Sequence, residues 1–271
     1  MTEYSEWTPA HARDWIAVPR EWDDKYSRGV LGIVTGSEDY PGAAVLGVDA
    51  ALHTGVGMVR HLGPARVSSL VLARRPEVVT IDGRVQAWVL GSGMDESMED
   101  PLISAHLATA LSSGYPLVLD AGAIGSVREA KGPAVVTPHH GELARVLRAD
   151  VAEIAAEPEI WARRAADSLG LTVVLKGHTT LVCGVGGSYA ITSPTTWLAT
   201  AGTGDSLAGI LGALVATHAK AIADDVGTLT HLAATAVLLH GLAAEGAGAG
   251  GPFTVLGLNA QLPAAIAALL R

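Results

Sequence analysis

Short apolar runs alternate with longer helical patterns along most of the chain. The runs, which end near a glycine or a polar residue, are 29–37, 87–93, 116–122, 134–142 and 171–177. Helical patterns follow the first two runs, at 42–55 and 101–114. Strands that alternate with helices in this way are typical of a parallel sheet covered by helices on both faces.

The pattern changes after Lys176. Two apolar stretches, 179–184 and 187–193, flank a Gly-Gly pair and predict an antiparallel hairpin. The remainder is helical, with patterns at 204–219, 231–247 and 258–270, the first of them beginning near Ser206. No linker rich in proline, serine or charge divides the chain, so we expect one α/β domain over 29–271 with a central, mostly parallel sheet.

Residues 1–28 form an N-terminal extension that precedes this pattern. It carries Trp7, Trp15 and Trp22, three of the six tryptophans of the chain, at spacings that define no helical face. We expect the extension to pack on the body of the domain. The first residues also lack the basic start and apolar core of an export signal.

Composition narrows the classes of protein. Hydrophobic residues make up 49% of the chain and charged residues 17%, which is typical of a folded globular protein. The formal charge of −9 argues against a nucleic-acid partner, and the apolar stretches are too interrupted to span a membrane. Cys183 is the single cysteine, so an intrachain disulfide is excluded and a reducing, cytoplasmic location is expected.

The sharpest local motif is Thr200-Ala-Gly-Thr-Gly-Asp205, immediately before a long apolar helix. Gly202, Thr203 and Gly204 let the backbone approach a ligand, and the free N–H groups of a helix N-terminus bind anions. Asp205 has two interpretations at this point. It is either a cap or favourable charge at the helix N-terminus, or a general base beside a bound phosphate.

Other candidates follow strand ends, and each has an ordinary structural alternative. The turns at 36–44 and 91–93 are either ligand loops or common strand-to-helix turns, and Asp120 either holds a ligand or forms a turn. His139 and Glu142 are either functional or a surface histidine and a helix-start acid. Lys176 places a cation at the sheet edge, followed by the hydroxyls of Thr179 and Thr180. Walker A, zinc-protease and nucleophile-elbow motifs are absent.

Taken in order, seven motifs resemble the ADP-dependent (S)-NAD(P)H-hydrate dehydratases of the ribokinase-like superfamily. They are GS(x)4GAA, LGSGM, VLDAGAI, VTPHHGE, VVLKGHTTLV, LATAGTGDSLAGIL and AVLLHGLAAEGA. The resemblance covers about Gly29 to Leu270 and implies a ribokinase-like fold. It also implies dehydration of hydrated NADH or NADPH, driven by conversion of ADP to AMP and phosphate.

The resemblance also implies roles for individual residues. Asp205 would be the catalytic base and would also contact the hydrated dinucleotide, NADHX or NADPHX. The nucleotide would be bound by Lys176, Gly177, His178, Thr179, Thr180, Gly202, Thr203 and Gly204. Ala43, Gly93 and His139 would contact the hydrated dinucleotide, and Glu142 would serve a Mg²⁺ ion carried on the nucleotide phosphates.

Two rival functions stay open. One is an ATP-dependent small-molecule kinase of the same superfamily, of the hydroxymethylpyrimidine or hydroxyethylthiazole kinase type, with Asp205 in the same role. The other is a non-catalytic nucleotide-sensing module. The resemblance further implies a homotetramer, for which the small-residue helices would provide close packing. Since only about 28 residues precede the body, epimerisation of the hydrates is expected from a separate chain.

Overall fold

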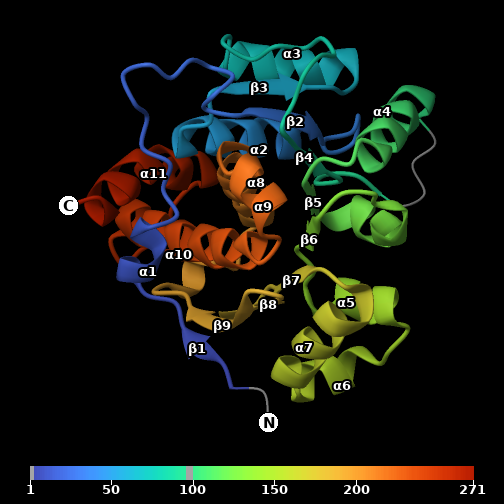
Figure 1. The fold of residues 1–271 in the computed structure, drawn as a ribbon, viewed down its shortest axis with the longest axis vertical. Helices are drawn as coiled ribbons and strands as arrows, with labels where there is room; N and C mark the ends of the chain where they lie inside the picture. Colours follow the sequence, from blue (N-terminus) through green and yellow to red (C-terminus); the bar gives the residue numbers. More distant parts are fainter. Residues whose placement is uncertain (1–2, 96–99) are drawn as a thin grey trace.

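The computed structural model describes residues 3–95 and 100–271 of the chain (Figure 1). In this part of the chain, one sheet has nine strands in the order β1-β9-β8-β7-β6-β5-β4-β2-β3. The strands are β1 (Ser5–Glu6), β2 (Val30–Val34), β3 (Met58–His61), β4 (Ala87–Leu90), β5 (Leu117–Leu119), β6 (Ala134–Val136), β7 (Thr172–Leu175), β8 (Thr179–Gly184) and β9 (Gly187–Thr192).

Most strand pairs are parallel, as the sequence predicts. Strands β2 to β7 are all parallel to one another. Strand β8 is antiparallel to β7 and to β9, which confirms the predicted hairpin. Because all the parallel strands point the same way, the residues that follow them meet at one edge of the sheet.

Helices cover both faces of the sheet (Figure 1). In β2, Leu31 and Ile33 belong to one apolar cluster, and Val30 and Val34 belong to the other. The helices are α1 (Pro9–Arg13), α2 (Pro41–Thr54), α3 (Ala65–Arg74), α4 (Pro101–Ser112), α5 (His140–Leu147), α6 (Val151–Ala156), α7 (Pro158–Leu169), α8 (Thr203–Thr217), α9 (Ala219–Asp224), α10 (Thr228–Gly248) and α11 (Val255–Leu269), with 3₁₀ helices η1 (Ala121–Glu129) and η2 (Thr196–Leu198). None of the helices described is both long and apolar enough to cross a bilayer.

Helix α8 crosses α2 at very short range. A Cβ atom on Gly209 would lie 2.1 Å from the carbonyl oxygen of Gly47, so only glycine fits at this crossing. On its other side, a Cβ atom on Gly212 would lie 2.2 Å from the side chain of Val89 in the sheet. The small residues of α8 thus serve packing within the chain, whereas the sequence interpretation assigned them to packing between subunits.

The N-terminal extension contributes a strand and a helix to the fold. Strand β1 pairs in parallel with β9, so the extension lengthens the sheet. Trp7 is 6% exposed, donates its indole N–H to the Thr235 hydroxyl at 3.2 Å and stacks on His231. Trp15 also packs against the core. Trp22, in contrast, is 76% exposed, and the guanidinium group of Arg20 lies over its ring.

Candidate active site

Three polar side chains, each after a different strand, converge on the carboxylate of Asp120. Asp120, after β5, is 3% exposed and accepts hydrogen bonds from Ser92 after β4 at 2.8 Å and from Thr137 after β6 at 2.7 Å. Lys176, after β7, places its Nζ atom 3.1 Å from Asp120 Oδ1. Asp120 makes no cap bond with the 3₁₀ helix η1 that it precedes. The turn-forming interpretation therefore does not account for its carboxylate.

Lys176 stands between carboxylates. Its Nζ atom lies 3.7 Å from Glu142 Oε2 in addition to its bond with Asp120. Burial opposes the charged form of Lys176, but the negative charges of Asp120 and Glu142 outweigh it and raise the pKa of the lysine. Lys176 is thus held as a cation at the edge of the sheet, next to the first turn of α8.

Asp205 lies in that first turn. Helix α8 begins at Thr203, and its N-cap is Gly202, whose φ of 93° is the left-handed conformation that glycine tolerates. Since the N-cap is Gly202, Asp205 is not the cap of this helix and stands within its first turn. Burial, together with the charge of Asp120, raises the pKa of Asp205 to about 7, although Lys176 lowers it. A carboxyl group with this pKa can take up and release a proton near neutral pH.

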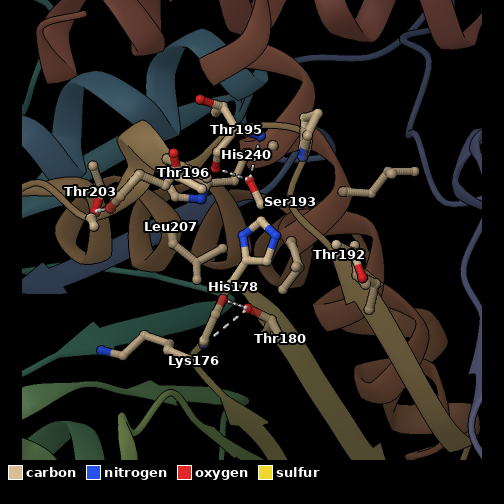
Figure 2. A pocket seen from close by; sticks show the side chains of 18 of the residues that line it. Lys176, His178, Thr180, Thr192, Ser193, Thr195, Thr196, Thr203, Leu207 and His240 are labelled. Carbon is tan, nitrogen blue, oxygen red and sulfur yellow. Dashed lines mark hydrogen bonds between the residues drawn. The ribbon is translucent and has the colours of Figure 1, made fainter. Parts of the chain in front are cut away.

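A cavity of about 630 Å³ opens beside the first turn of α8 (Figure 2). Its walls come from the β8–β9 hairpin, the loop after β9, α8 and α10. Six residues that the family resemblance assigns to the nucleotide line it: Lys176, Gly177, His178, Thr180, Thr203 and Gly204. A cavity of this size is of the order that holds a small-molecule ligand, about 300 to 1,000 Å³.

Two of the predicted nucleotide residues lie outside this lining. Thr179 is exposed, and its hydroxyl pairs with that of Thr192 at 2.9 Å. Gly202 supports the turn before α8 without lining the cavity. The hydroxyl of Thr203 donates to the carbonyl oxygens of Leu198 and Thr200, and its backbone N–H also donates to Thr200 at 3.3 Å, so both donors of Thr203 are engaged within the turn.

The apolar half of the cavity was missed by the sequence interpretation. It includes Leu198 of η2, Leu207 of α8 and Val237 of α10. His240 of α10 also lines it; burial lowers the pKa of His240 to about 4, so its imidazole is neutral at pH 7. The Nε2 atom of His240 is buried and has no hydrogen-bond partner among the residues that the structure describes. An apolar wall with a few polar groups is the usual lining of a small-molecule site.

The residues assigned to the hydrated dinucleotide lie on other elements. Gly93, with a φ of 67°, approaches Ala43 so closely that a Cβ atom on Gly93 would lie 2.4 Å from the Cβ atom of Ala43. The turns at 36–44 and 91–93 are therefore neighbours. Neither Ala43 nor Gly93 lines the cavity, and Ala43 is only 6% exposed.

His139 is the N-cap of α5, and its Nδ1 atom accepts bonds from the backbone N–H groups of Gly141 and Glu142. Glu142 completes the capping box, because its Oε2 atom accepts from the N–H of His139 at 2.7 Å. The side chain of His139 is 58% exposed and its other nitrogen lies 3.6 Å from Glu142 Oε1. Among the residues described, no group of three or more His, Cys, Asp or Glu side chains forms a metal cage.

Comparison with known proteins identifies the family. Residues 31–257 match the family model described as NAD(P)H-hydrate dehydratase. The chain belongs to this family. It is 41% identical over 213 residues to the bifunctional NAD(P)H-hydrate repair enzyme Nnr of Mycobacterium tuberculosis, a match that covers 73% of this chain and 43% of that protein. This chain thus spans less than half the length of that relative.

Relatives of similar length also match. The ADP-dependent (S)-NAD(P)H-hydrate dehydratase of Neisseria meningitidis is 35% identical over 206 residues, which covers 69% of each chain. The ADP/ATP-dependent NAD(P)H-hydrate dehydratase of Bacillus subtilis, co-crystallised with ATP and Mg²⁺, superposes with a TM-score of 0.86 at 26% identity. That superposition covers 99% of this chain and 100% of the other, so the ribokinase-like fold extends over the whole domain.

Proposed function

We propose that this chain restores NADH and NADPH from their (6S)-hydrated forms by dehydration that consumes ADP and yields AMP and phosphate. The observation that carries the proposal is the position of Asp205. Its carboxyl group, with a pKa raised to about 7, lies in the first turn of α8 at the edge of a nucleotide-sized cavity. Family membership supplies the substrate class.

In this reaction, Asp205 takes the proton from the hydroxyl group of the hydrated ring. The hydroxyl oxygen then forms a bond to the terminal phosphorus of ADP, and the bond to the AMP oxygen breaks. Phosphate departs from the resulting ester with the electron pair of the C–O bond, the neighbouring carbon releases a proton to water, and the electron pair of that C–H bond forms the ring double bond. Phosphate is a far better leaving group than hydroxide, which is why the nucleotide is consumed.

The transferred phosphoryl group would be stabilised by fixed dipoles and one cation. The N–H groups of Gly202, Thr203 and Gly204 lie at the N-terminus of α8, where an anion is favoured electrostatically. Lys176 supplies the positive charge, and Gly177, His178, Thr179 and Thr180 form the loop around the nucleotide phosphates. The apolar half of the cavity, with Leu198, Leu207 and Val237, would accept the adenine ring.

The hydrated dinucleotide would approach from the side of Ala43 and Gly93. Small residues at these two positions let the turns at 36–44 and 91–93 pack against each other, which fixes their backbones in one arrangement. His139 would donate from its Nε2 atom, since its Nδ1 atom already accepts the cap bonds of α5. Asp205 would then stand between the two substrates.

The acidic groups of the site fit a magnesium ion that the nucleotide brings with it. Glu142 offers a carboxylate that is shared with a helix cap and with Lys176, so it would contribute at most a single contact. Mg²⁺ usually keeps several waters and relies on substrate phosphates together with one or two carboxylates. Bound in this way, the ion would neutralise phosphate charge.

An assay with purified protein tests the proposal. Recovery of the absorbance of the reduced nicotinamide ring is followed after mixing with NADHX and ADP, with separate reactions that contain ATP or no nucleotide. We expect recovery that depends on ADP. Phosphorylation of a pyrimidine or thiazole alcohol with ATP, in place of recovery, would indicate the kinase; nucleotide binding without turnover would indicate the sensor.

Two further proposals concern the context of the enzyme. A cytoplasmic location is supported by the single, buried Cys183. A homotetramer is proposed from family resemblance alone, because the small residues of α8 pack inside the chain; light scattering would reveal a monomer directly.

A further inference from the structure

We infer that Asn259 is a positioning residue for Asp205. Asn259, on α11, is fully buried, and its side-chain amide joins α2 to α8. Its Nδ2 atom donates to Asp49 Oδ2 at 3.0 Å and to the carbonyl oxygen of Leu46 at 3.1 Å, both on α2. Its Oδ1 atom accepts from the hydroxyl of Ser206 on α8. The inference rests on the proposed function, since it concerns the base of that reaction.

The hydrogen-bonded network of Ser206, Asn259 and Asp49 is anchored at Asp49. Asp49 is fully buried, and its Oδ1 atom accepts from Nε of Arg74 at 3.0 Å and from Nε of Arg75 at 2.8 Å. These arginines lie at the end of α3. Every member has its partners, so the amide orientation of Asn259 is fixed by the donors and acceptors around it. A buried network of this kind holds its elements in one arrangement.

The other end of the network is Ser206, the residue next to Asp205 in sequence. Ser206 follows Asp205 in the first turn of α8 and is fully buried. The carbonyl oxygen of Asp205 packs against Gly47 of α2, where a Cβ atom would lie 3.2 Å from it. Helix α2 also carries Ala43, on the proposed dinucleotide side. The bond between Ser206 and Asn259 therefore sets where the turn that carries Asp205 sits relative to that side.

Packing alone would leave this turn less constrained. The crossing at Gly47 and Gly209 allows close approach, but glycines contribute no side chain that could prevent sliding along the helix axis. The Asn259 amide supplies directional bonds to both helices at once. Displacements of about 1 Å at a reacting group can lower turnover about 100-fold, so loss of this link has a catalytic consequence.

The test compares Ser206→Ala and Asn259→Ala with a matched control, Thr230→Val. Thr230 is also fully buried, and its hydroxyl bonds with that of Thr172 at 3.2 Å, at the opposite end of β7 from Lys176. For each variant, kcat, KM for ADP, Tm and amide hydrogen exchange at residues 203–208 are measured. The double variant of Ser206 and Asn259 is included because residues that act through one link give non-additive losses.

We expect Ser206→Ala to lower kcat about 10- to 100-fold with KM for ADP within about twofold, and to speed exchange at 203–208. The double variant should lose no more activity than Asn259→Ala alone. Thr230→Val should lower Tm and retain kcat. Wild-type kcat or unchanged hydrogen exchange in Ser206→Ala would overturn the inference. An equal loss of kcat in Thr230→Val would also overturn it. If wild type fails to turn over NADHX, the proposed function falls, and exchange at 203–208 alone decides the inference.

Discussion

The ammonium group of Lys176 lies 3.1 Å from the Oδ1 atom of Asp120, and these two charges act in opposite directions on Asp205. The negative charge of Asp120 raises the pKa of Asp205, whereas the positive charge of Lys176 lowers it. Burial of Asp205 is the larger cause of the shift, and together with Asp120 it raises the pKa to about 7. The pair therefore tunes the base and also supplies a cation for the phosphates.

The pH dependence of kcat/KM follows from this arrangement. Asp205 is an active base only when it is deprotonated, so activity should rise with pH through an apparent pKa of about 7. Asp120→Asn removes a negative neighbour and should move this limb to lower pH. Lys176→Met removes a positive neighbour and should move it to higher pH. Profiles of the three enzymes, measured with saturating ADP, check both directions; shifts in the same direction would contradict the account.

The stability of the folded protein should depend on pH in the opposite direction to activity. The pKa of Asp205 is raised in the folded state, so the folded protein binds a proton that the unfolded chain releases between about pH 4 and pH 7. Stability is therefore lost as the pH rises through this window. Asparagine does not ionise, so the Asp205→Asn variant does not lose stability in this window. Its free energy of unfolding at pH 8 should exceed that of wild type by up to about 4 kcal/mol.

Denaturant unfolding at pH 5 and pH 8 measures the difference for Asp205→Asn. The gain at pH 8 should exceed the gain at pH 5. Glu159→Gln, on the exposed surface of α7, provides a control that should show no comparable dependence. Equal effects of Asp205→Asn at both values of pH would show that burial does not raise this pKa.

The cavity beside α8 should govern affinity for the nucleotide. Val237 lies on the cavity wall, so Val237→Phe would place a ring in the space proposed for adenine. We expect KM for ADP to rise at least about tenfold, since steric loss of a buried apolar contact of this size costs about 1 to 3 kcal/mol. KM for NADHX should change little. Val237→Ile, which adds one methylene, should have a small effect; equal KM values for all three enzymes would exclude this cavity as the adenine site.

The N-terminal extension should contribute to stability through one tryptophan. Trp7 is buried against His231, Tyr189 and Thr235, so Trp7→Ala should lower the free energy of unfolding by about 3 to 5 kcal/mol. Trp22→Ala should change it by less than about 0.5 kcal/mol, because Trp22 is 76% exposed. Chemical denaturation of the two variants measures the contrast, and similar losses would contradict the packing.

The parallel body of the sheet could be predicted because its signal is local. Each buried strand is an apolar run, and the hairpin β8–β9 is marked by its glycines. Strands β1 and β3 were missed for physical reasons. β1 consists of Ser5 and Glu6, which join the sheet through backbone pairing and have no apolar pattern. β3 has four residues, of which Arg60 and His61 are polar.

The site could be predicted only in part. The order of the motifs predicted that Asp205 and Lys176 lie near a nucleotide. The spacing of residues did not reveal the contacts of Asp120, whose partners follow other strands: Ser92, Thr137 and Lys176. The sequence did not reveal the apolar cavity wall at Val237, because a helix that lines a cavity has the same composition as a helix that is buried in the core. The link from Ser206 to Asn259 spans 53 residues and depends on how three helices cross.

The most direct test of the central claim compares wild type with Asp205→Asn in the conversion of NADHX to NADH with ADP. The account predicts ADP-dependent turnover by wild type and a loss in kcat of at least about 100-fold in the variant, because general-base catalysis contributes about 10² to 10⁴ in rate. ADP should still bind the variant in calorimetry. Turnover by Asp205→Asn at the wild-type rate would contradict the claim that this carboxylate is the base.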